Sequence, residues 1–432
     1  MIPALSTTLV AADWTRFRGT DGLGVCTETE SIPTTWSDTE NLQWKAALPG
    51  PGSSSAIVLG ERVYVTCYSG VVDESVEQLK RHLVCLDRNT GEIVWDTVVA
   101  AEQPEDPYQG FITQHGYASQ TPITDGERIY VFMGKSGVRA FDLEGKEVWK
   151  AEVGKESSPM RWGSGTSPVL YNDYVIVNSS DESQSIRALD KKTGKEVWKA
   201  EASSLDNAYG TPALVETADG SKELVIAVGG EMWGPNPDNG KLRWYAATGT
   251  QGGVYSSPVA AGDVAFSLGG RGAGSIAVRG GGRSDVTDSH VKWSNTYSSS
   301  VPSPLLYEGR LYWLDDRGIA RCVATDSGEL VYQSRLEGFS TSRGAGGGGG
   351  RGGFGSGGGP AVYASPTYAD GKIYLVSRFN GVFVVAAKTT FEQMAHNKFV
   401  ADDSQFNGSP AVSNGQMFLR SDKFLYCVAE GK

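Results

Sequence analysis

Short apolar segments alternate with polar turns along almost the whole chain, and the clearest example runs from Val175 to Trp198. Val175–Val177 and Ile186–Leu189 are short, β-branched and bounded by polar residues, which is typical of neighbouring strands. The polar run Asp190–Gly194 follows them and ends in glycine. This pattern predicts a tight turn in which the Asp190 carboxylate accepts hydrogen bonds from backbone amides.

Copies of this unit return along the chain, for example at 85–95, 140–149 and 322–332. Each copy ends in an aromatic residue on the next predicted strand. We expect that ring to fill the gap between adjacent sheets, with the indole N–H donating to a backbone carbonyl. The docking positions are Trp44, Trp95, Trp149, Trp198, Trp244, Trp293 and Tyr332.

A second marker, a small residue followed by proline, precedes each copy. Its prolines are Pro122, Pro168, Pro212, Pro258, Pro304, Pro366 and Pro410, and Ser55-Ala56 is a degenerate first member. Most successive prolines are 44 or 46 residues apart, which is close to the period of a four-stranded propeller blade. Eight markers therefore predict an all-β fold, an eight-bladed β-propeller of four-stranded antiparallel blades.

The two ends of the sequence predict how the ring closes. Phe424–Val428 is expected to be the third strand of the eighth blade, and no fourth strand follows it before Lys432. Asn41–Lys45 has the form of a fourth strand, with Trp44 at the docking position. We expect this N-terminal strand to complete the last blade, because closure leaves no sheet edge unpaired.

Length and charge agree with one ring of repeats. The chain has 432 residues and a net charge of -11, so we expect no nucleic-acid partner. Beyond residues 1–12 no apolar stretch is long enough to span a bilayer, so we also expect no transmembrane segment. We expect residues 13–432 to form a single domain and the protein to be a monomer. The glycine-rich stretch 343–360 cannot bury enough apolar surface to order itself, which predicts a flexible loop between blades six and seven.

Residues 1–12 are apolar and end in Val10-Ala11-Ala12, like the distal half of a secretory signal. The positively charged segment of such a signal is missing. The segment predicts an exported protein, periplasmic or extracellular, with a mature N-terminus near Asp13. A disordered apolar tail is the alternative.

The cysteines and histidines follow no metal-binding or redox spacing, so we expect no metal site. Cys85, Cys322 and Cys427 occupy positions that hold alanine in other copies, which predicts buried packing residues. Cys67 and Cys85 lie on strands expected to be adjacent and could instead form a disulfide. No nucleophile-elbow motif is present, and we assign no catalytic residues.

The repeat form Ala-x-Asp-x-x-Thr-Gly-Lys-x-x-Trp at 188–198, together with Asp13-Trp14 and Phe17–Gly19, resembles the pyrroloquinoline quinone (PQQ) type of eight-bladed propeller in secreted bacterial proteins. That family includes quinone-dependent alcohol dehydrogenases and non-enzymatic scaffolds such as the outer-membrane assembly propeller. The resemblance therefore implies the fold but not one function. The dehydrogenases use adjacent, disulfide-bonded cysteines and a calcium ion, and this chain has no adjacent cysteines. No cofactor is therefore expected, and PQQ with calcium is kept as the alternative.

The loops that enter the first strand of each blade and the turns between second and third strands are expected to share one rim of the propeller. Arginine and aromatic residues there suit carboxylate-bearing, sugar or peptide ligands. The candidate ligand-binding residues are His115, Tyr117, Arg161, Trp162, Tyr209, Glu231, Trp233, Arg271, Asp316, Arg317, Arg378 and Arg420.

The sequence therefore favours a non-catalytic binding or scaffolding propeller of the cell envelope, with an unknown protein or glycan partner at the rim. A PQQ-dependent quinoprotein-type oxidoreductase acting on alcohols or sugars is the first alternative. A polysaccharide-active hydrolase or lyase is the second.

Overall fold

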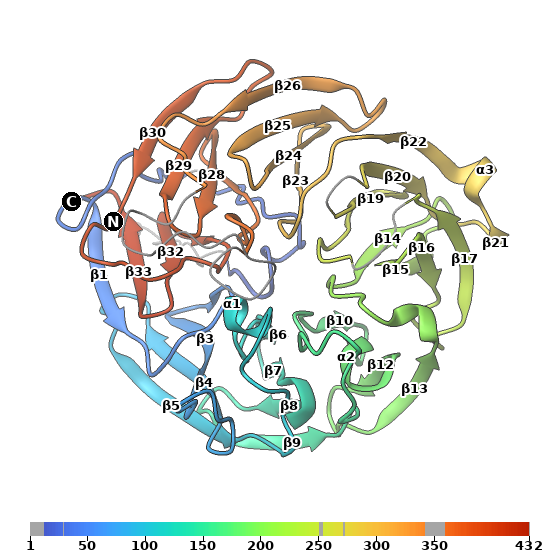
Figure 1. Ribbon diagram of the computed structural model, residues 1–432, viewed down its shortest axis with the longest axis horizontal. Coiled ribbons are helices and arrows are strands. Elements are labelled where there is room, and N and C mark those ends of the chain that lie inside the picture. The colour runs from blue at the N-terminus through green and yellow to red at the C-terminus, as the bar shows by residue number, and fades with distance from the viewer. Residues whose placement is uncertain (1–12, 29, 250–253, 271–272, 342–358, 432) are drawn as a thin grey trace, which may run out of the picture.

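Eight sheets surround one axis, so the chain folds into the predicted eight-bladed propeller (Figure 1). The computed structural model describes residues 13–28, 30–249, 254–270, 273–341 and 359–431. In each blade the first strand lies nearest the axis and the last strand lies at the outer edge. Residues 1–12, Arg271 and nearly all of the predicted loop 343–360 lie outside the described residues, so the predictions for them stay predictions.

The strands of the first four blades follow one another along the chain and pair antiparallel. They are β2 Ile57–Leu59, β3 Arg62–Ser69, β4 Lys80–Asp87 and β5 Ile93–Ala100; β6 Ile123–Thr124, β7 Ile129–Phe132, β8 Val138–Phe141 and β9 Glu147–Ala151; β10 Val169–Tyr171, β11 Tyr174–Ser179, β12 Ser185–Asp190 and β13 Glu196–Glu201; β14 Ala213–Glu216, β15 Lys222–Val228, β16 Glu231–Pro235 and β17 Leu242–Ala247.

The last four blades repeat this order, and the eighth takes its outer strand from the N-terminal region. Their strands are β18 Val259–Ala261, β19 Val264–Leu268, β20 Ser275–Arg279 and β22 Val291–Asn295; β23 Leu305–Tyr307, β24 Arg310–Leu314, β25 Ile319–Ala324 and β26 Leu330–Arg335; β27 Thr367–Ala369, β28 Lys372–Ser377, β29 Gly381–Ala386 and β30 Gln393–Asn397; β31 Ala411–Ser413, β32 Gln416–Arg420, β33 Phe424–Ala429 and β1 Leu42–Ala47.

A few short elements decorate the ring. Strand β21, Ser284–Asp285, adds a parallel fifth strand beside β17. The α-helices are α1 Ile112–His115, α2 Ser180–Ser183 and α3 Thr287–His290, and 3-10 turns lie at Gly134–Ser136 and Ser203–Leu205. None of the described helices is long and apolar enough to span a bilayer.

The predicted closure is confirmed, because β1 pairs antiparallel with β33. In this pairing Trp44 lies opposite Cys427. The N-terminal and C-terminal strands therefore share one sheet at the left of Figure 1.

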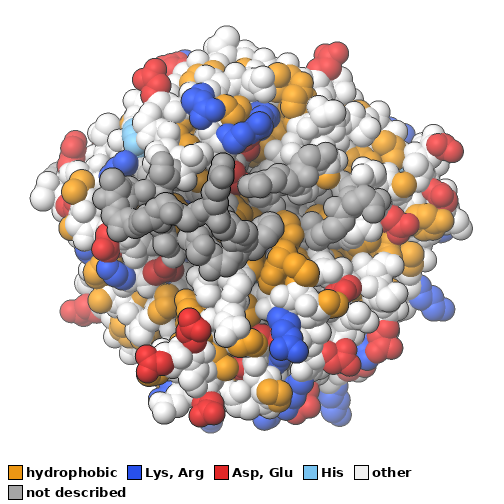
Figure 2. Space-filling model, in the orientation of Figure 1, with side chains coloured by type: hydrophobic (Ala, Val, Ile, Leu, Met, Phe, Trp, Pro, Cys, Tyr) orange, Lys and Arg blue, Asp and Glu red, His pale blue; other side chains and the backbone are white. Residues whose placement is uncertain are grey.

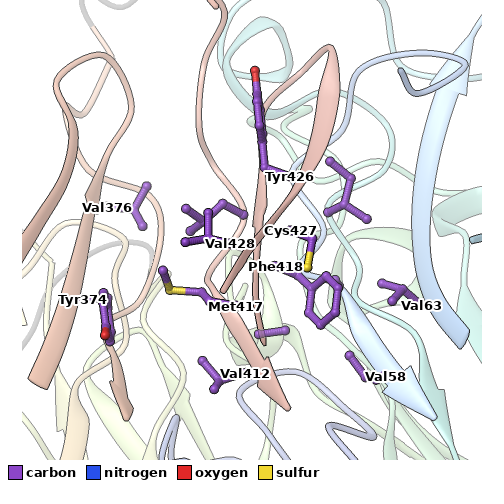
Figure 3. Packing of buried hydrophobic residues seen from close by; sticks show 14 of the residues in the cluster. Val58, Val63, Tyr374, Val376, Val412, Met417, Phe418, Tyr426, Cys427 and Val428 are labelled. Carbon is purple, nitrogen blue, oxygen red and sulfur yellow. The ribbon is translucent and has the colours of Figure 1, made fainter. Parts of the chain in front are cut away.

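The hydrophobic core lies between neighbouring blades. In the eighth blade, successive residues point to opposite faces of the sheet, as the two-residue period of a strand requires. Met417 and Val428 face Tyr374 of the seventh blade, while Phe418 and Cys427 face the first blade (Figure 3). Each side chain buried in such a layer contributes roughly 1.5–3 kcal/mol.

The docking tryptophans cross these interblade layers as predicted. The indole N–H donates to a carbonyl of the next blade in five cases: Trp44 to Arg88 at 2.8 Å, Trp95 to Leu143 at 3.1 Å, Trp149 to Lys191 at 3.0 Å, Trp198 to Pro237 at 2.9 Å and Trp293 to Thr325 at 2.8 Å. Trp244 differs, because its indole N–H donates to the Glu223 carboxylate of its own blade at 2.7 Å. Tyr332 packs edge-on against Phe391 at 5.7 Å between ring centroids.

The turn glycine of each unit belongs to the same contact. Gly194 has φ 73°, and a Cβ there would lie 2.6 Å from Cε3 of Trp149 in the preceding blade. The positive φ and the tight approach both require glycine. The Thr-Gly turn and the tryptophan one blade earlier thus form one packing contact between consecutive blades.

The two predictions for the cysteines have different outcomes: the buried packing role is confirmed and the disulfide is wrong. All five cysteines are described, buried and free. Cys85, Cys322 and Cys427 are the packing residues that the repeat predicts. The Cys67–Cys85 disulfide is wrong, because Cys67 lies opposite His82 while Cys85 lies opposite Tyr64. A three-residue offset along adjacent strands exceeds the reach of a disulfide.

Candidate functional site

Eight hydroxyl-bearing residues, one from each marker, meet around the axis. Each backbone N–H donates to the hydroxyl oxygen of the next blade at 2.9 or 3.0 Å, and Ser409 donates back to Ser55. We call this closed circle the hydroxyl ring. Its members are Ser55, Thr121, Ser167, Thr211, Ser257, Ser303, Ser365 and Ser409.

The proline of each marker explains the geometry of the ring. A residue before proline is held in an extended conformation, and proline itself has no N–H to donate. The ring residues are all buried. Within the described part of the chain their hydroxyls accept hydrogen bonds but donate to no protein acceptor, which leaves eight O–H donors at the axis.

A second layer of side chains lies directly above the ring. Residues two positions apart on an extended chain point to the same side, so the residue two before each ring member also faces the axis. This upper layer consists of Ser53, Ser119, Gly165, Tyr209, Tyr255, Val301, Tyr363 and Asn407. Small side chains lie on one half of the circle and tyrosines on the other, which makes the wall asymmetric.

Both layers line a cavity of about 120 Å³, together with Phe111, His115 and Trp162 from the loops above the small half. The aromatic rings touch one another: centroids are 4.7 Å apart for Phe111 and Trp162, 5.8 Å for Trp162 and Tyr255, and 5.6 Å for Tyr209 and Tyr255. Hydrophobic side chains gather at the centre of this face (Figure 2). Among the described residues that line the cavity, none is acidic or basic apart from His115.

His115 joins two of the loops at the cavity wall. Its Nε2 lies 2.9 Å from the carbonyl oxygen of Trp162, so Nε2 carries the proton and donates. Its Nδ1 then accepts from the Ser119 hydroxyl at 2.7 Å. Burial, opposed by the hydrogen bond to the Trp162 carbonyl and assisted by the charge of Arg378, lowers the pKa of His115 to about 4. The imidazole is therefore neutral at pH 7.

Arg378 and Arg420, predicted to bind a ligand, are instead buried behind this wall and hold its backbone and side chains in place. The Arg378 guanidinium is fully buried and donates to the Asn407 amide oxygen at 3.0 Å and to the carbonyl oxygen of Pro360 at 2.9 Å. It also lies 4.4 Å from the centroid of the Tyr363 ring. Arg420 donates to the carbonyl oxygen of Ser54 at 3.1 Å. The charge of each is already engaged by the protein.

Three of the predicted site residues come together at the cavity: His115, Trp162 and Tyr209. Arg378 and Arg420 lie behind its wall, and the remaining candidates lie apart from it. Tyr117 is buried and donates to the Asp106 carbonyl, Glu231 accepts from Trp233, Asp316 accepts from Ser300, Arg317 donates to Asp315, Arg161 is exposed, and Arg271 lies outside the described residues.

Sequence reasoning missed Phe111, Ser119, Tyr255 and Tyr363. For the last three a signal was available, because each precedes a ring hydroxyl by two positions. Phe111 lies next to α1, in a long insertion outside the repeat, so periodicity could not place it.

A buried charged network lies beside the cavity, on β4, the segment that precedes α1, the 3-10 turn Gly134–Ser136 and α2. Lys135 contacts Asp106 at 2.9 Å, and Arg81 contacts Glu105 at 2.6 Å. Burial, followed by the charge of the neighbouring Asp181, raises the pKa of Glu182 to about 8. Glu182 is therefore mainly protonated at neutral pH.

Comparison with protein families identifies one match, which covers most of the ring. Residues 35–207 and 81–334 match the PQQ-like repeat family described as outer membrane protein assembly factor BamB. The chain is also 23% identical over 451 residues to a polyvinylalcohol dehydrogenase of a Pseudomonas species, which covers 79% of this chain and 69% of that protein.

Two further relatives match a smaller part. A quinoprotein ethanol dehydrogenase of Pseudomonas aeruginosa is 30% identical over 145 residues, 30% of this chain and 23% of that enzyme. A quinoprotein alcohol dehydrogenase of Pseudomonas putida is 30% identical over 152 residues, 33% of this chain and 25% of that enzyme. The match thus spans about a quarter of the length of these two dehydrogenases.

Solved structures share the fold at low sequence identity. The crystal structure of BamB from Moraxella catarrhalis superposes with a TM-score of 0.61 at 14% identity, covering 90% of this chain and 97% of that one. The computationally designed Ika8 protein superposes with a TM-score of 0.59 at 10% identity, covering 89% and 98%.

Proposed function

We propose that this chain, which belongs to the PQQ-like repeat family described as outer membrane protein assembly factor BamB, is a binding or scaffolding propeller of the cell envelope. Its ligand docks at the cavity above the hydroxyl ring. Export is supported by the signal-like residues 1–12 and by the description of the family.

The cavity wall is the observation that carries this proposal. It combines aromatic faces, O–H donors without described acceptors and a neutral histidine, with no charged side chain among the described lining residues. Aromatic faces stack on the apolar C–H faces of a ring-shaped ligand, and hydroxyls exchange hydrogen bonds with its polar substituents. A neutral, hydroxyl-bearing ring such as a sugar unit of a glycan suits this wall. A protein partner at the same rim is the alternative occupant.

The dehydrogenase relatives favour a second candidate, a PQQ-dependent oxidoreductase. The residues of this chain do not fit that cofactor. No charged side chain among the described lining residues could meet the carboxylates of the quinone. The sequence has no adjacent cysteines, and the described residues contain no group of three His, Cys, Asp or Glu able to hold a metal ion. We therefore derive no redox step for this cavity.

The test is a titration of the full chain with neutral oligosaccharides derived from cellulose, chitin and starch, followed by tryptophan fluorescence and thermal midpoint. A ligand at one hundred times its Kd stabilises a protein by about 2.7 kcal/mol. We expect Trp162→Ala to remove the response, while the matched variant Trp233→Ala, outside the cavity lining, keeps it. PQQ with calcium forms a separate arm. A shift that requires PQQ, or no shift with any sugar, contradicts the proposal.

A further inference from the structure

Three serine–histidine pairs occur among the described residues, and they differ in what holds the imidazole. Ser119 pairs with His115, whose other nitrogen meets a backbone carbonyl. Ser289 pairs with His290 at 2.8 Å on the exposed helix α3, and no described carboxylate bonds that imidazole. Among the residues that the structure describes, only the third pair, Ser69 and His82, also has a carboxylate partner.

Ser69, His82 and Asp96 form a hydrogen-bonded chain across three neighbouring strands of the first blade. The Ser69 hydroxyl lies 2.8 Å from Nε2 of His82, and Nδ1 of His82 lies 3.0 Å from both carboxylate oxygens of Asp96. A carboxylate only accepts, so Nδ1 carries the proton and donates to it. Nε2 is then unprotonated and accepts from the Ser69 hydroxyl.

The sheet register fixes this arrangement. Strands β3, β4 and β5 lie side by side (Figure 1), and Cys67 is opposite His82 while Asp96 is opposite Val84. Ser69 is two residues from Cys67, and Asp96 is two residues from Val98, which is opposite His82 on the other side. Side chains two residues apart on a strand point to the same face, so Ser69, His82 and Asp96 share one face of the sheet. The constellation is a product of pairing, which is why no local sequence motif marks it.

We propose that Ser69 is a nucleophile and His82 its general base, oriented by Asp96, at a second site that cleaves esters with an apolar acyl group. Nucleophile, base and orienting group at 2.6–3.2 Å are the arrangement that activates serine in hydrolases of unrelated folds. None of these three residues lines the cavity, so this site stands or fails independently of ligand binding there.

The chemical step balances without a further reactant except water. His82 Nε2 takes the Ser69 proton as the Ser69 oxygen bonds to the ester carbonyl carbon. The bond to the alcohol oxygen then breaks, and the proton on Nε2 passes to the departing alcohol. Water attacks the acyl carbon in the second half, gives its proton to Nε2, and the acid leaves as Ser69 regains its hydrogen.

Two features at the site suit this reaction. The backbone N–H groups of Gly70 and Val71, directly after the nucleophile, donate to no acceptor in the described part of the chain, so they are available to an oxyanion. Val98 lies opposite His82 and is 49% exposed. Its side chain offers an apolar surface beside the base, which favours an apolar acyl group.

The test is covalent labelling of the full chain with a fluorophosphonate probe, located by peptide mass spectrometry. In this reaction the Ser69 oxygen bonds to phosphorus, fluoride leaves and His82 takes the proton. We expect Ser69 to be the labelled residue and Ser69→Ala to remove the label, while Ser289→Ala leaves it unchanged. His82→Gln should slow labelling at least 100-fold. Labelling of Ser119 or Ser289 instead, or no labelling, overturns the proposal.

Asp96 acts through His82 and is therefore a positioning residue. Asp96→Asn should slow labelling at least tenfold without moving the thermal midpoint, and Asp96→Glu should recover part of the rate. Ser69→Cys offers a second measurement if His82→Gln fails to fold. Its thiol should react with iodoacetamide, releasing iodide, faster than the thiol of Ser289→Cys, and the five native cysteines give little background because all are buried. Equal rates for the two thiols overturn the proposal.

Discussion

The backbone N–H of Ser409 donates to Oγ of Ser55 at 3.0 Å, although the two residues are 354 positions apart. This bond completes the hydroxyl ring on the inside of the propeller, as the pairing of β1 with β33 completes it on the outside. The propeller is therefore closed both near its axis and at its outer edge, and each closure can be tested separately.

Ser167→Ala should lower the free energy of unfolding by about 1–3 kcal/mol, because it leaves the buried N–H of Thr121 without the acceptor that now lies at 3.0 Å. Chemical denaturation measures the change. Ser289→Ala, on the exposed helix α3, is the control and should stay within about 0.5 kcal/mol. Equal effects of the two variants would falsify a stabilising role for the ring.

Gly194→Ala should be clearly more destabilising than Gly220→Ala. Both glycines have positive φ, 73° and 79°, so both variants carry the same backbone strain of about 1 kcal/mol. Only Gly194 is pressed against Trp149; a Cβ at Gly220 meets nothing within 4 Å. The difference between their unfolding free energies therefore measures the docking contact, and we expect about 1–3 kcal/mol. Identical values would show that the ring yields to the extra methyl group.

Gly165→Leu should block the cavity without unfolding the protein. A Cβ at Gly165 meets no atom within 4 Å, and the residue lines the cavity. The new side chain should weaken oligosaccharide binding at least tenfold while the thermal midpoint stays unchanged. Gly165→Ala, which adds only one methyl group, is the matched control and should retain most of the affinity. Full binding by the leucine variant would place the ligand elsewhere.

Stability should fall as pH rises from about 4.5 to 8 through the contribution of Glu182. Its folded-state pKa is raised from 4.5 to about 8, so the folded protein holds a proton that the unfolded chain releases across this range. Glu182→Gln removes that release and should flatten the dependence of the free energy of unfolding on pH. The stability of the variant relative to the unchanged protein should be higher at pH 9 than at pH 5 by at least about 1 kcal/mol. Thermal unfolding at several pH values measures it. The exposed variant Glu77→Gln should leave the curve unchanged.

The sequence was sufficient for the ring and insufficient for the site, for a physical reason. The Ser-Pro marker, the Thr-Gly turn and the docking tryptophan act within one blade or between two consecutive blades, so their spacing alone predicts them. Trp244 shows the limit even there: Glu223 of the same blade captures its indole N–H.

Site residues depend instead on how loops of unequal length fold over the axis. Arg378 and Arg420 lie at turns and look exposed in sequence, yet both are buried and engaged by backbone carbonyls and side chains. The pairing of Ser69 with His82 and Asp96 is equally invisible, because it depends on strand register.

The hydroxyl ring has an electrostatic consequence. Every N–H···O bond points from one blade to the next in the same rotational sense, including the last, from Ser409 to Ser55. The dipole components that lie in the plane of the ring, arranged head to tail around a circle, therefore cancel, so no point on the circumference is a positive or negative end. A neutral guest at the axis would thus meet equivalent hydrogen-bonding groups in every direction around the channel, whereas a row of the same bonds in a line would present it with two unlike ends.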